Sequence, residues 1–565
     1  MESGSAASEV TAGELAAKVL VRNGVRAVFS LSGGHIFPFY DGCHREGIRI
    51  VDVRHEASAV FASEALAKLT RSPQVAILTA GPGVTNAVSA MTTAGFNGSP
   101  VVVLAGRAQE ARWGSGSLQE LDHVPIVAPV VKQAGTVHKV EDVEVELERA
   151  FRLAGSTHRG PVFLDFPLDV LFSSTAALEG ATEIDRRGNW PVRAAQPAGG
   201  VAARPGSTEV GSVGELLVEA ERPVLFAGSD VFWAGAWDQL RRLAELTETP
   251  VFANGLGRGC LPADHPLCFS RARPLVNEAD LVVVVGTPLD FRLSFGHFGA
   301  AKVVHIADDQ SQLASHVELA SGLVGEIGAV LDAIAWSVGD EKGLSASAGR
   351  SHSEWVHRLS REEQGRRAME VSNLSSEATP IHPLRIYGEL RKRLDHNAIV
   401  IGDGGDFVSF AGRYIDSYEP GCWLDPGPFG CLGTGLGYAI GARIAHPDRQ
   451  VVLLAGDGAF GFSGMDIDTL VRHGLACVIV VGNNGIWGLE KHPMKAIYGY
   501  DVAADLQPGC RYDLVAKALG AEGELVTDPA QVGPALDRAL GCGAPYLVNV
   551  VTDPEVVYPR SSNLA

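Results

Sequence analysis

The residues best suited to chemistry lie in two short polar segments of the carboxyl-terminal part of the chain. A Gly-Asp-Gly sequence occupies residues 456–458, and an Asn-Asn pair occupies residues 483–484. Apolar runs at residues 451–454 and 477–481 lead into these segments and are typical of buried parallel strands. A helix over about residues 465–472 would cross between the two strands.

This arrangement predicts a site for a metal-bridged diphosphate. Asp457 and Asn484 would emerge at the same edge of one sheet, where open α/β sheets bind ligands. A carboxylate and an amide oxygen suit Mg²⁺, which prefers hard oxygen ligands. Gly456 and Gly458 would let backbone N–H groups approach a phosphate closely. Gly-Asp-Gly alone is usually a turn, and the Asn pair after a βαβ unit makes the pattern specific.

The elements that must position these residues belong to a large α/β protein. The 565 residues suffice for three or four domains, and 46% hydrophobic and 20% charged residues are ordinary for that class. The formal net charge of -19 argues against nucleic acid or an anionic membrane as the main partner. Simple solubility is a sufficient reason for such a charge.

Cysteine usage and apolar runs bear on the cellular compartment. None of the eight cysteines forms a C-x-x-C pair, so neither a zinc site nor a redox pair is indicated. Residues 1–10 lack the apolar core of a signal peptide, and no apolar run reaches about 18 residues. We therefore expect a cytoplasmic protein without a transmembrane helix.

Three α/β blocks follow one another along the chain. Predicted strands in the first block are residues 27–31, 50–53, 75–79, 101–104 and 162–166; those in the second are 223–228, 279–286 and 302–307; those in the third are 398–401, 451–454 and 477–481. The alternation of strands with helical segments predicts mostly parallel sheets flanked by helices. The expected domains are residues 1–185, 208–338 and 375–552. The tail at 553–565, with Tyr558 and Arg560, could fold over the active site as a lid.

Segments between the blocks read as connectors. Residues 186–207 are rich in Pro, Gly, Arg and Ala, and residues 339–379 are polar with an amphipathic helix at about 353–369. The first and third blocks could be distant structural duplicates, which the sequence alone does not show.

Further candidate residues follow other predicted strands. Glu56 begins a helical run after residues 50–53, where a carboxylate also complements the helix dipole. A Gly-Pro-Gly-Val-Thr-Asn segment, residues 81–86, follows another strand. Asp406 and Phe407 come after the strand at 398–401, where the backbone could meet a diphosphate.

Taken together, these motifs resemble those of thiamine diphosphate (ThDP) enzymes over residues 10–552. The resemblance implies a three-domain architecture with an amino-terminal pyrimidine-binding domain, a central nucleotide-binding-like domain and a carboxyl-terminal diphosphate-binding domain. It implies that Glu56 lies beside N1′ of the aminopyrimidine, and that Leu432, in a glycine-dense segment, is the apolar wedge that bends the cofactor. The metal ligands would be Asp457, Asn484 and Ile486. The other residues expected at the cofactor are Asn86, Asp406, Phe407, Gly456, Gly458 and Ala459.

Within this superfamily the chain most resembles the acyl-CoA branch. Residues 459–465, Ala-Phe-Gly-Phe-Ser-Gly-Met, and residues 483–487, Asn-Asn-Gly-Ile-Trp, are similar to segments of that branch. We therefore expect a 2-hydroxyacyl-CoA lyase that cleaves the C1–C2 bond to formyl-CoA and a ketone or aldehyde. The alternatives are an acetolactate synthase-like enzyme, an oxalyl-CoA decarboxylase, and a regulatory homologue that binds ligand without turnover. The intact set of Glu56, Asp457 and Asn484 argues against the last.

The identity of the base that removes the proton of the substrate hydroxyl stays open. The candidates are Glu490, Glu120 and His35, and Gln119 is expected beside them in the active site. A Gln-Glu pair such as Gln119-Glu120 also occurs in acetolactate synthases, so it does not discriminate. The substrate side chain cannot be read from the sequence.

The last expectations concern a nucleotide site in the central block and the oligomeric state. Asp308 ends a strand, and Arg159 precedes one; both could contact a nucleotide, and both could equally be solvated surface charges. ADP, CoA and FAD all remain candidate ligands. The resemblance further implies a homodimer or homotetramer with active sites at subunit interfaces.

Overall fold

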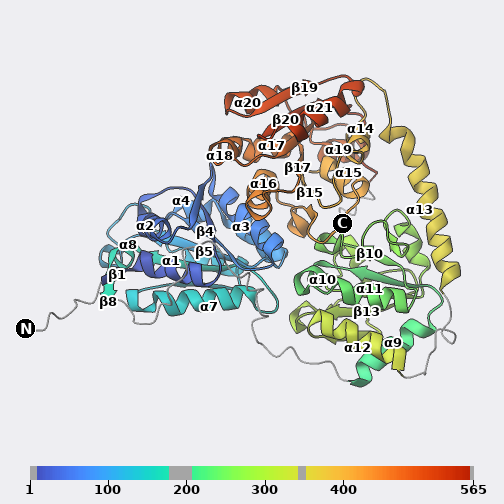
Figure 1. Ribbon diagram of the computed structural model, residues 1–565, viewed down its shortest axis with the longest axis horizontal. Coiled ribbons are helices and arrows are strands. Elements are labelled where there is room, and N and C mark those ends of the chain that lie inside the picture. The colour runs from blue at the N-terminus through green and yellow to red at the C-terminus, as the bar shows by residue number, and fades with distance from the viewer. Residues whose placement is uncertain (1–8, 177–206, 341–351, 560–565) are drawn as a thin grey trace, which may run out of the picture. The chain divides into compact units, whose positions relative to one another are not determined.

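The computed structural model describes residues 9–176, 207–340 and 352–559. It divides into two compact units, whose helices and strands are labelled in Figure 1. Unit 1 comprises residues 1–200, 429–445 and 465–473, and unit 2 comprises residues 201–428, 446–464 and 474–565, each as far as it is described. The expected linker at 186–207 lies outside the described residues except for Ser207. Residues 341–351 of the expected connector at 339–379 also lie outside them.

Unit 1 is built on a six-stranded parallel sheet with the order β3-β2-β4-β5-β7-β6. The strands are β2 (Ala27–Ser30), β3 (Arg49–Asp52), β4 (Gln74–Leu78), β5 (Val101–Arg107), β6 (Gln133–Thr136) and β7 (Val162–Pro167). Its helices include α1 (Ala12–Arg22), α2 (Phe37–Arg45), α3 (Glu56–Thr70), α5 (Val88–Phe96) and α7 (Val143–Gly155). β1 (Glu9–Thr11) and β8 (Ser174–Ala176) form a small antiparallel pair. β4 is buried along its whole length, as its apolar sequence predicts.

Helix α3 packs closely on α16 (Thr434–Ala445), which also belongs to unit 1. Glycines of α16 allow this approach, because a Cβ at Gly437 would lie 2.6 Å from the Cβ of Phe61. A buried polar network crosses the same contact. Lys68 pairs with Glu64 at 2.9 Å, and Tyr438 donates a hydrogen bond to Glu64 at 2.8 Å. Since every charge in it has a partner, the network fixes one register of the two helices.

The central sheet of unit 2 has the order β11-β10-β9-β12-β13-β14, all parallel. Its strands are β9 (Pro223–Ala227), β10 (Val251–Ala253), β11 (Cys268–Phe269), β12 (Leu281–Val285), β13 (Lys302–Ala307) and β14 (Ser321–Val324). Numbered within the sheet, the order is 3-2-1-4-5-6, that of dinucleotide-binding folds. The accompanying helices include α9 (Ser207–Glu219), α10 (Ser229–Ala234), α11 (Trp237–Leu246) and α12 (Ile327–Asp340).

The second sheet of unit 2 has the order β16-β15-β17-β18-β20-β19, again all parallel. Its strands are β15 (Ile399–Asp403), β16 (Trp423–Leu424), β17 (Val451–Gly456), β18 (Val478–Asn483), β19 (Glu522–Val526) and β20 (Tyr546–Val551). The helices of this region that belong to unit 2 include α14 (Leu384–Leu390), α15 (Asp406–Tyr414), α20 (Tyr512–Ala518) and α21 (Pro529–Gly541). Numbered within the sheet, its order is 2-1-3-4-6-5, and the sheet of unit 1 has that same order. The first and third blocks therefore share one connectivity.

The three parallel sheets confirm the predicted α/β architecture. In each sheet the strand that follows the first one in the chain lies on one side of it, and later strands are added on its other side. This reversal lies between β2 and β4, between β9 and β12, and between β15 and β17. Ligands of such folds bind at the carboxyl ends of the strands beside this switch point. Among the described residues, no helix combines the length and apolarity needed to cross a membrane.

The helix expected at about 465–472 is present as α18 (Ile467–Arg472), and a further helix that was not expected precedes it. Helix α17 (Asp457–Ser463) begins at Asp457 itself, and a 3-10 turn, Gly464–Asp466, separates it from α18 (Ile467–Arg472). The glycines at 458, 461 and 464 suggest a loop, but the segment is helical. Asp457 therefore stands in the first turn of a helix, where a negative charge is stabilised.

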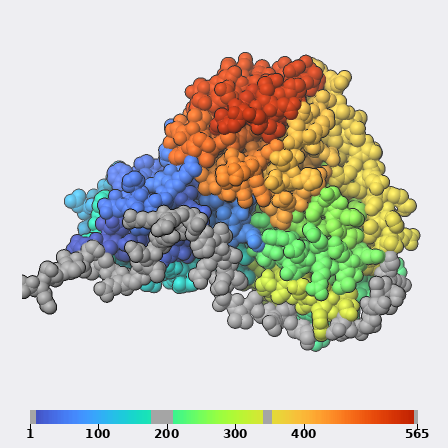
Figure 2. All heavy atoms as spheres, in the orientation of Figure 1, coloured from blue at the N-terminus to red at the C-terminus, as the bar shows by residue number. Residues whose placement is uncertain are grey.

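Helix α13 (Ser353–Leu374) is longer than expected and is tied by ion pairs to both sheets of unit 2. Its Glu363 accepts the N–H groups of Ser270, Arg271 and Ala272 near the central sheet. Its Arg367 donates to Asp416 at 3.0 Å, close to the second sheet. In Figure 1 and Figure 2 the helix, in yellow, runs from the green central part toward the red carboxyl-terminal part.

Candidate active site

Asp457 and Asn484 meet at the carboxyl edge of the second sheet of unit 2, as predicted. Asp457 is buried, and its two oxygens accept the N–H groups of Gly458 at 3.0 Å and Gly485 at 2.8 Å. Asn484 follows β18, and its amide donates to the Asp406 carboxylate at 3.1 Å. Its oxygen accepts the N–H of Ile486 at 3.2 Å. Three neighbouring strands, β15, β17 and β18, thus bring together Asp406, Asp457 and Asn484.

Glycines around these residues leave no space for side chains. A Cβ at Gly458 would lie 2.4 Å from the ring of Trp487, and one at Gly488 would lie 2.3 Å from the Asp406 carboxylate. Gly404, with a φ of +119°, has a conformation that other residues rarely adopt. The backbone of this edge is therefore open to close approach by a ligand.

The electrostatics of this edge favour a cation. Burial raises the pKa of Asp457 to about 6, two backbone N–H groups oppose the shift, and the nearby Asp406 adds to it. Burial also raises the pKa of Asp406. Two neighbouring carboxylates, Asp457 buried and Asp406 half-buried, are costly without a compensating positive charge. The oxygen donors of Asp457 and Asn484, with the Ile486 carbonyl, fit Mg²⁺.

The other residues predicted at this edge have mixed surroundings. Gly456 ends β17, and Ala459 is buried in α17. The side chain of Phe407 is in the core, where it fills the space beside Gly482, so only its backbone could face a ligand. Glu490 is exposed in the first turn of α19 (Gly488–Tyr498), four residues after Ile486. Its role as a base stays a prediction.

Glu56 stands at the carboxyl edge of the sheet of unit 1. It is the first residue of α3 and is buried, with 6% of its surface exposed. The amide of Asn86 donates to its carboxylate at 3.0 Å. A Cβ at Gly83 would lie 3.8 Å from its other oxygen. Glu56 and Asn86, each predicted separately to lie at the cofactor, are thus in direct contact.

A second carboxylate, Asp466, fixes the backbone around Glu56 within unit 1. It accepts the N–H of Arg54 at 2.8 Å and the hydroxyl of Ser58 at 2.5 Å. Those residues lie two positions before and two positions after Glu56. Sequence reasoning missed Asp466, because 408 positions separate it from Ser58 and no motif marks it.

The loop expected near the substrate lies at the same edge of unit 1. Gln119 has a φ of +58° and contacts Gly81, where a Cβ would lie 2.9 Å from its own. The Glu120 carboxylate accepts the N–H groups of Gly114 and Ser117, so it caps its own loop. His35 is buried; burial lowers its pKa, and a hydrogen bond with the Leu118 backbone opposes that shift.

A buried histidine that sequence reasoning missed ends this loop. His123 Nε2 accepts the N–H of Gly81 at 2.9 Å, and Nδ1 lies 2.8 Å from the Asp165 carboxylate. Arg107 also donates to Asp165, at 3.2 Å. Gly81 and Asp165 each lie 42 residues from His123 along the chain, so these contacts could not be predicted from the sequence.

Two further predictions concern the apolar wedge, Leu432, and the carboxyl-terminal tail. Leu432 is half-buried in the turn before α16 of unit 1, and its predicted contact with the cofactor stays a prediction. In the tail, the Tyr558 ring packs against Phe410 at 5.0 Å between centroids. Arg560 lies outside the described residues. The tail as an active-site lid remains a prediction.

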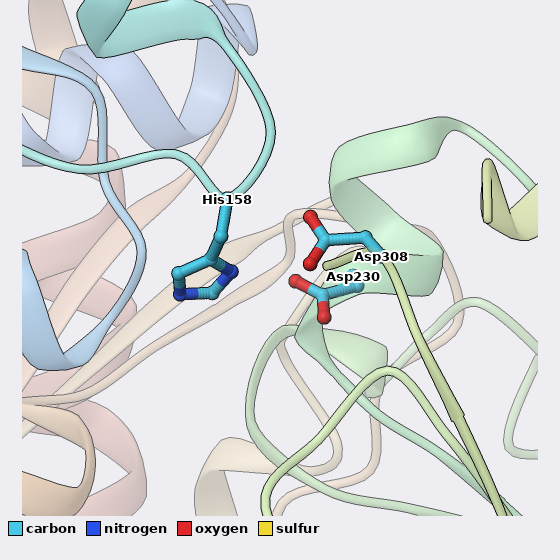
Figure 3. Close-up of side chains that lie close together, drawn as sticks. All are labelled: His158, Asp230 and Asp308. Atoms are coloured by element: carbon cyan, nitrogen blue, oxygen red, sulfur yellow. The ribbon is translucent and has the colours of Figure 1, made fainter. Parts of the chain in front are cut away.

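The central sheet places two carboxylates at its switch point. Asp230 lies in α10 after β9, and Asp308 follows β13; both are buried, and Figure 3 shows them side by side. A Cβ at Gly286 would lie 2.6 Å from that of Asp230, so the strand ends approach closely. Arg159, a residue of unit 1, is half-buried before β7. Nucleotide binding by Arg159 and Asp308 remains a prediction.

The fold is that of an α/β enzyme, and the residues at these sheet edges would suit a metal-bridged diphosphate. Three family models match the chain: the N-terminal TPP binding domain of thiamine pyrophosphate enzymes at residues 10–126, their central domain at 210–334, and their C-terminal TPP binding domain at 403–550. The chain belongs to the thiamine pyrophosphate enzyme family.

Curated relatives refine the comparison. The chain is 50% identical, over 99% of both proteins, to a probable acetolactate synthase of Mycobacterium bovis and to the acetolactate synthase large subunit IlvG of Mycobacterium tuberculosis. It is 34% identical to 2-hydroxyacyl-CoA lyase 2 of Xenopus laevis, over 90% of this chain and 84% of the relative. It is 32% identical to the human 2-hydroxyacyl-CoA lyase 2, over 95% and 89%.

Proposed function

We propose that the chain is an acetolactate synthase-like enzyme that condenses two 2-oxo acid molecules with ThDP and Mg²⁺. The observation that carries this choice is the identity of 50% over essentially the whole length to two proteins of that name. The sequence segments at 459–465 and 483–487 favour the acyl-CoA lyase instead, but the lyases are less similar to this chain. With pyruvate, two molecules and one proton give acetolactate and carbon dioxide.

The site residues have defined tasks in this proposal. When bound, ThDP would supply a nucleophilic carbon and an electron sink for decarboxylation. Asp457, Asn484 and the carbonyl of Ile486 hold the Mg²⁺ that binds the diphosphate. Glu56 exchanges a proton at N1′ of the aminopyrimidine, and Asn86 orients its carboxylate.

A 2-hydroxyacyl-CoA lyase is the second candidate. Support comes from the two sequence segments and from relatives that cover 90% and 95% of this chain. This reaction needs a base for the 2-hydroxyl proton. Glu120 is engaged by two backbone N–H groups, whereas burial lowers the pKa of His35 and so favours its neutral, basic form. His35 is therefore a better candidate than Glu120, and Glu490 stays a candidate beside it.

The proposal extends to assembly, ligands and compartment. By family resemblance, we expect a homodimer or homotetramer in the cytoplasm, with each active site using Glu56 of one subunit and Asp457 of another. The central sheet, with its 3-2-1-4-5-6 order, would hold a nucleotide such as ADP, CoA or FAD.

One experiment separates the two reactions. The purified protein with ThDP and Mg²⁺ is given pyruvate in one assay and a panel of 2-hydroxyacyl-CoA thioesters in another. We expect acetolactate from pyruvate, and no acetolactate from the Glu56→Gln variant. Formyl-CoA with an aldehyde or ketone, in the absence of acetolactate, would establish the lyase and reject the synthase.

A further inference from the structure

The His123 side chain is fully buried in unit 1, and both of its ring nitrogens have partners. Nε2 accepts the N–H of Gly81 at 2.9 Å. A ring nitrogen that accepts a hydrogen bond carries no hydrogen, so the hydrogen of the neutral ring is on Nδ1. Nδ1 then donates to Asp165 at 2.8 Å, which fixes this tautomer.

Asp165 is itself fixed from a second side. It is fully buried in β7, and the same oxygen that meets His123 accepts from Arg107 at 3.2 Å. The Arg107 guanidinium stacks on the ring of Trp113, with 4.0 Å between its central carbon and the ring centroid. Arg107, Asp165 and His123 therefore form one ordered chain of contacts that ends at a single backbone N–H group.

That N–H group belongs to the turn that carries Asn86. Gly81 has a φ of +60°, and its carbonyl accepts the N–H groups of Val84 and Thr85. The short helix α4 (Pro82–Thr85) follows, and then Asn86, which donates to Glu56. Gly81 is thus the first fixed point of the segment that orients the Glu56 carboxylate.

We propose that His123 is a positioning residue for the cofactor-activating carboxylate. By accepting the Gly81 N–H, it sets the position of the turn at residues 81–86. Through Asn86, the turn sets the orientation of the Glu56 carboxylate. The same contact seats Gln119 against Gly81. The inference rests on the proposed role of Glu56, and it adds a residue that touches neither cofactor nor substrate.

Two substitutions at position 123 each keep one hydrogen bond of His123 and remove the other. The amide oxygen of Gln in His123→Gln reaches the place of Nε2 and can accept the Gly81 N–H. The shorter Asn in His123→Asn reaches only the place of Nδ1, so it can donate to Asp165 but loses Gly81. His138→Asn is the matched control, because His138 is an exposed histidine of the same unit and pairs with Glu110.

The first measurement is hydrogen–deuterium exchange of the protein without cofactor. We expect the peptide that contains residues 81–86 to exchange about tenfold faster in His123→Asn, because one buried hydrogen bond is lost. His123→Gln and His138→Asn should resemble the wild type there. Unchanged exchange of this peptide in His123→Asn would overturn the proposal. Equal loss of protection throughout unit 1 in both His123 variants would also overturn it, since His123 would then be a packing residue.

The second measurement is exchange of the C2 proton of bound ThDP, followed by NMR. We expect His123→Asn to slow it about tenfold, with ThDP affinity close to wild type, and His123→Gln to restore most of the rate. Equal rates in the two variants would contradict the positioning role. Glu56→Gln is measured alongside: wild-type exchange in that variant would reject the proposed role of Glu56, whereas the exchange of the 81–86 peptide tests His123 independently.

Discussion

The carboxylates of Asp457 and Glu56 are both buried, but their surroundings differ. Asp457 meets two backbone N–H groups and a neighbouring carboxylate, Asp406. Glu56 meets the amide of Asn86, and the backbone on either side of it is held by Asp466. The first arrangement suits a side chain that takes up a cation, and the second suits one that must keep a fixed orientation while it exchanges a proton.

Cation binding at Asp457 should depend on pH. Its pKa of about 6 lies above the ordinary value, so the protonated form dominates below about pH 6 and Mg²⁺ must displace a proton there. We expect Mg²⁺ with ThDP to raise the unfolding temperature strongly at about pH 7.5 and weakly at about pH 5.

For the protein without ligand, the effect of pH on folding stability at Asp457 has the opposite sign. A pKa raised by folding contributes stability below the unfolded pKa, and this contribution is lost as pH rises through about 6. Thermal unfolding of wild type and Asp457→Asn, with and without Mg²⁺ and ThDP, tests both statements. A ligand-induced shift in Asp457→Asn as large as in wild type would remove Asp457 from the metal site.

Asp466 should influence the orientation of the Glu56 carboxylate indirectly, through the backbone on either side of Glu56. In Asp466→Ala, the Arg54 N–H and the Ser58 hydroxyl lose a buried acceptor, which should lower the unfolding free energy by about 1–3 kcal/mol. C2 proton exchange of bound ThDP should also slow, because the carboxylate of Glu56 is less well held. Thr469→Val, which removes a hydroxyl shared between Asp466 and the Asp52 carbonyl, is the milder control. Wild-type C2 exchange in Asp466→Ala would show that Glu56 needs no such support.

At the scale of elements, the Gly458–Trp487 contact offers a steric test of the helix that starts at Asp457. A methyl group at Gly458 would lie 2.4 Å from the Trp487 ring, which must then move. We expect Gly458→Ala to weaken Mg²⁺-dependent ThDP binding at least about tenfold, because Trp487 follows the metal-binding segment directly.

Gly461→Ala in the same helix is the matched control. No atom lies within 4 Å of a Cβ there, so alanine should bind ThDP normally and raise the unfolding free energy by up to about 1 kcal/mol. Calorimetric titration with ThDP in the presence of Mg²⁺ measures both variants. Equal affinities would show that the position of Trp487 is not critical.

The elements that sequence reasoning predicted well are those with strong local signals. The apolar runs became β4, β12, β13, β17 and β18, with ends within two residues of the prediction. Glu56 begins α3 as expected, and Asp457 and Asn484 meet because the carboxyl ends of parallel strands share an edge. Long-range partners were not predictable: Asp466, Asp165 and His123 carry no motif, and their roles arise only from folding. The start of α17 was missed because its glycines favour a loop.

At the scale of the whole molecule, buried ion pairs should set the acid stability of unit 2. Burial alone would raise the pKa of Asp416, but hydrogen bonding to Arg367 and the charge of Arg271 lower it to about 2. A lowered pKa contributes stability above the unfolded value, and the contribution is lost as pH falls from about 4 to 2. We expect Asp416→Asn to lower the unfolding free energy by about 3–5 kcal/mol at pH 7, because Arg271 stays buried with less compensation.

Thermal unfolding as a function of pH measures this effect. The difference between wild type and Asp416→Asn should narrow as pH falls toward about 2, because the wild-type carboxylate is then protonated. Asp537→Asn is the control, since Asp537 is an exposed partner of Arg393 and its loss should change the unfolding free energy little. A difference that does not change with pH would assign the effect of Asp416 to packing.

Assembly can be tested by mixing subunits. If Glu56 of one subunit serves Asp457 of another, hybrids of Glu56→Gln and Asp457→Ala subunits contain one site with both residues intact. We expect partial recovery of activity after subunit exchange, up to about half of the wild-type value per hybrid dimer. Demonstrated exchange without recovery would show that both residues of a site come from one chain.

The identical strand order in the sheet of unit 1 and the second sheet of unit 2 has a historical consequence. Two blocks with one connectivity, 2-1-3-4-6-5, can descend from a single ancestral gene segment that was copied and fused. In the descendant copies the same sheet edge acquired different residues: Glu56 and Asn86 in one, Asp457 and Asn484 in the other. The central block has a different order, 3-2-1-4-5-6, so such a duplication would account for the two outer blocks only.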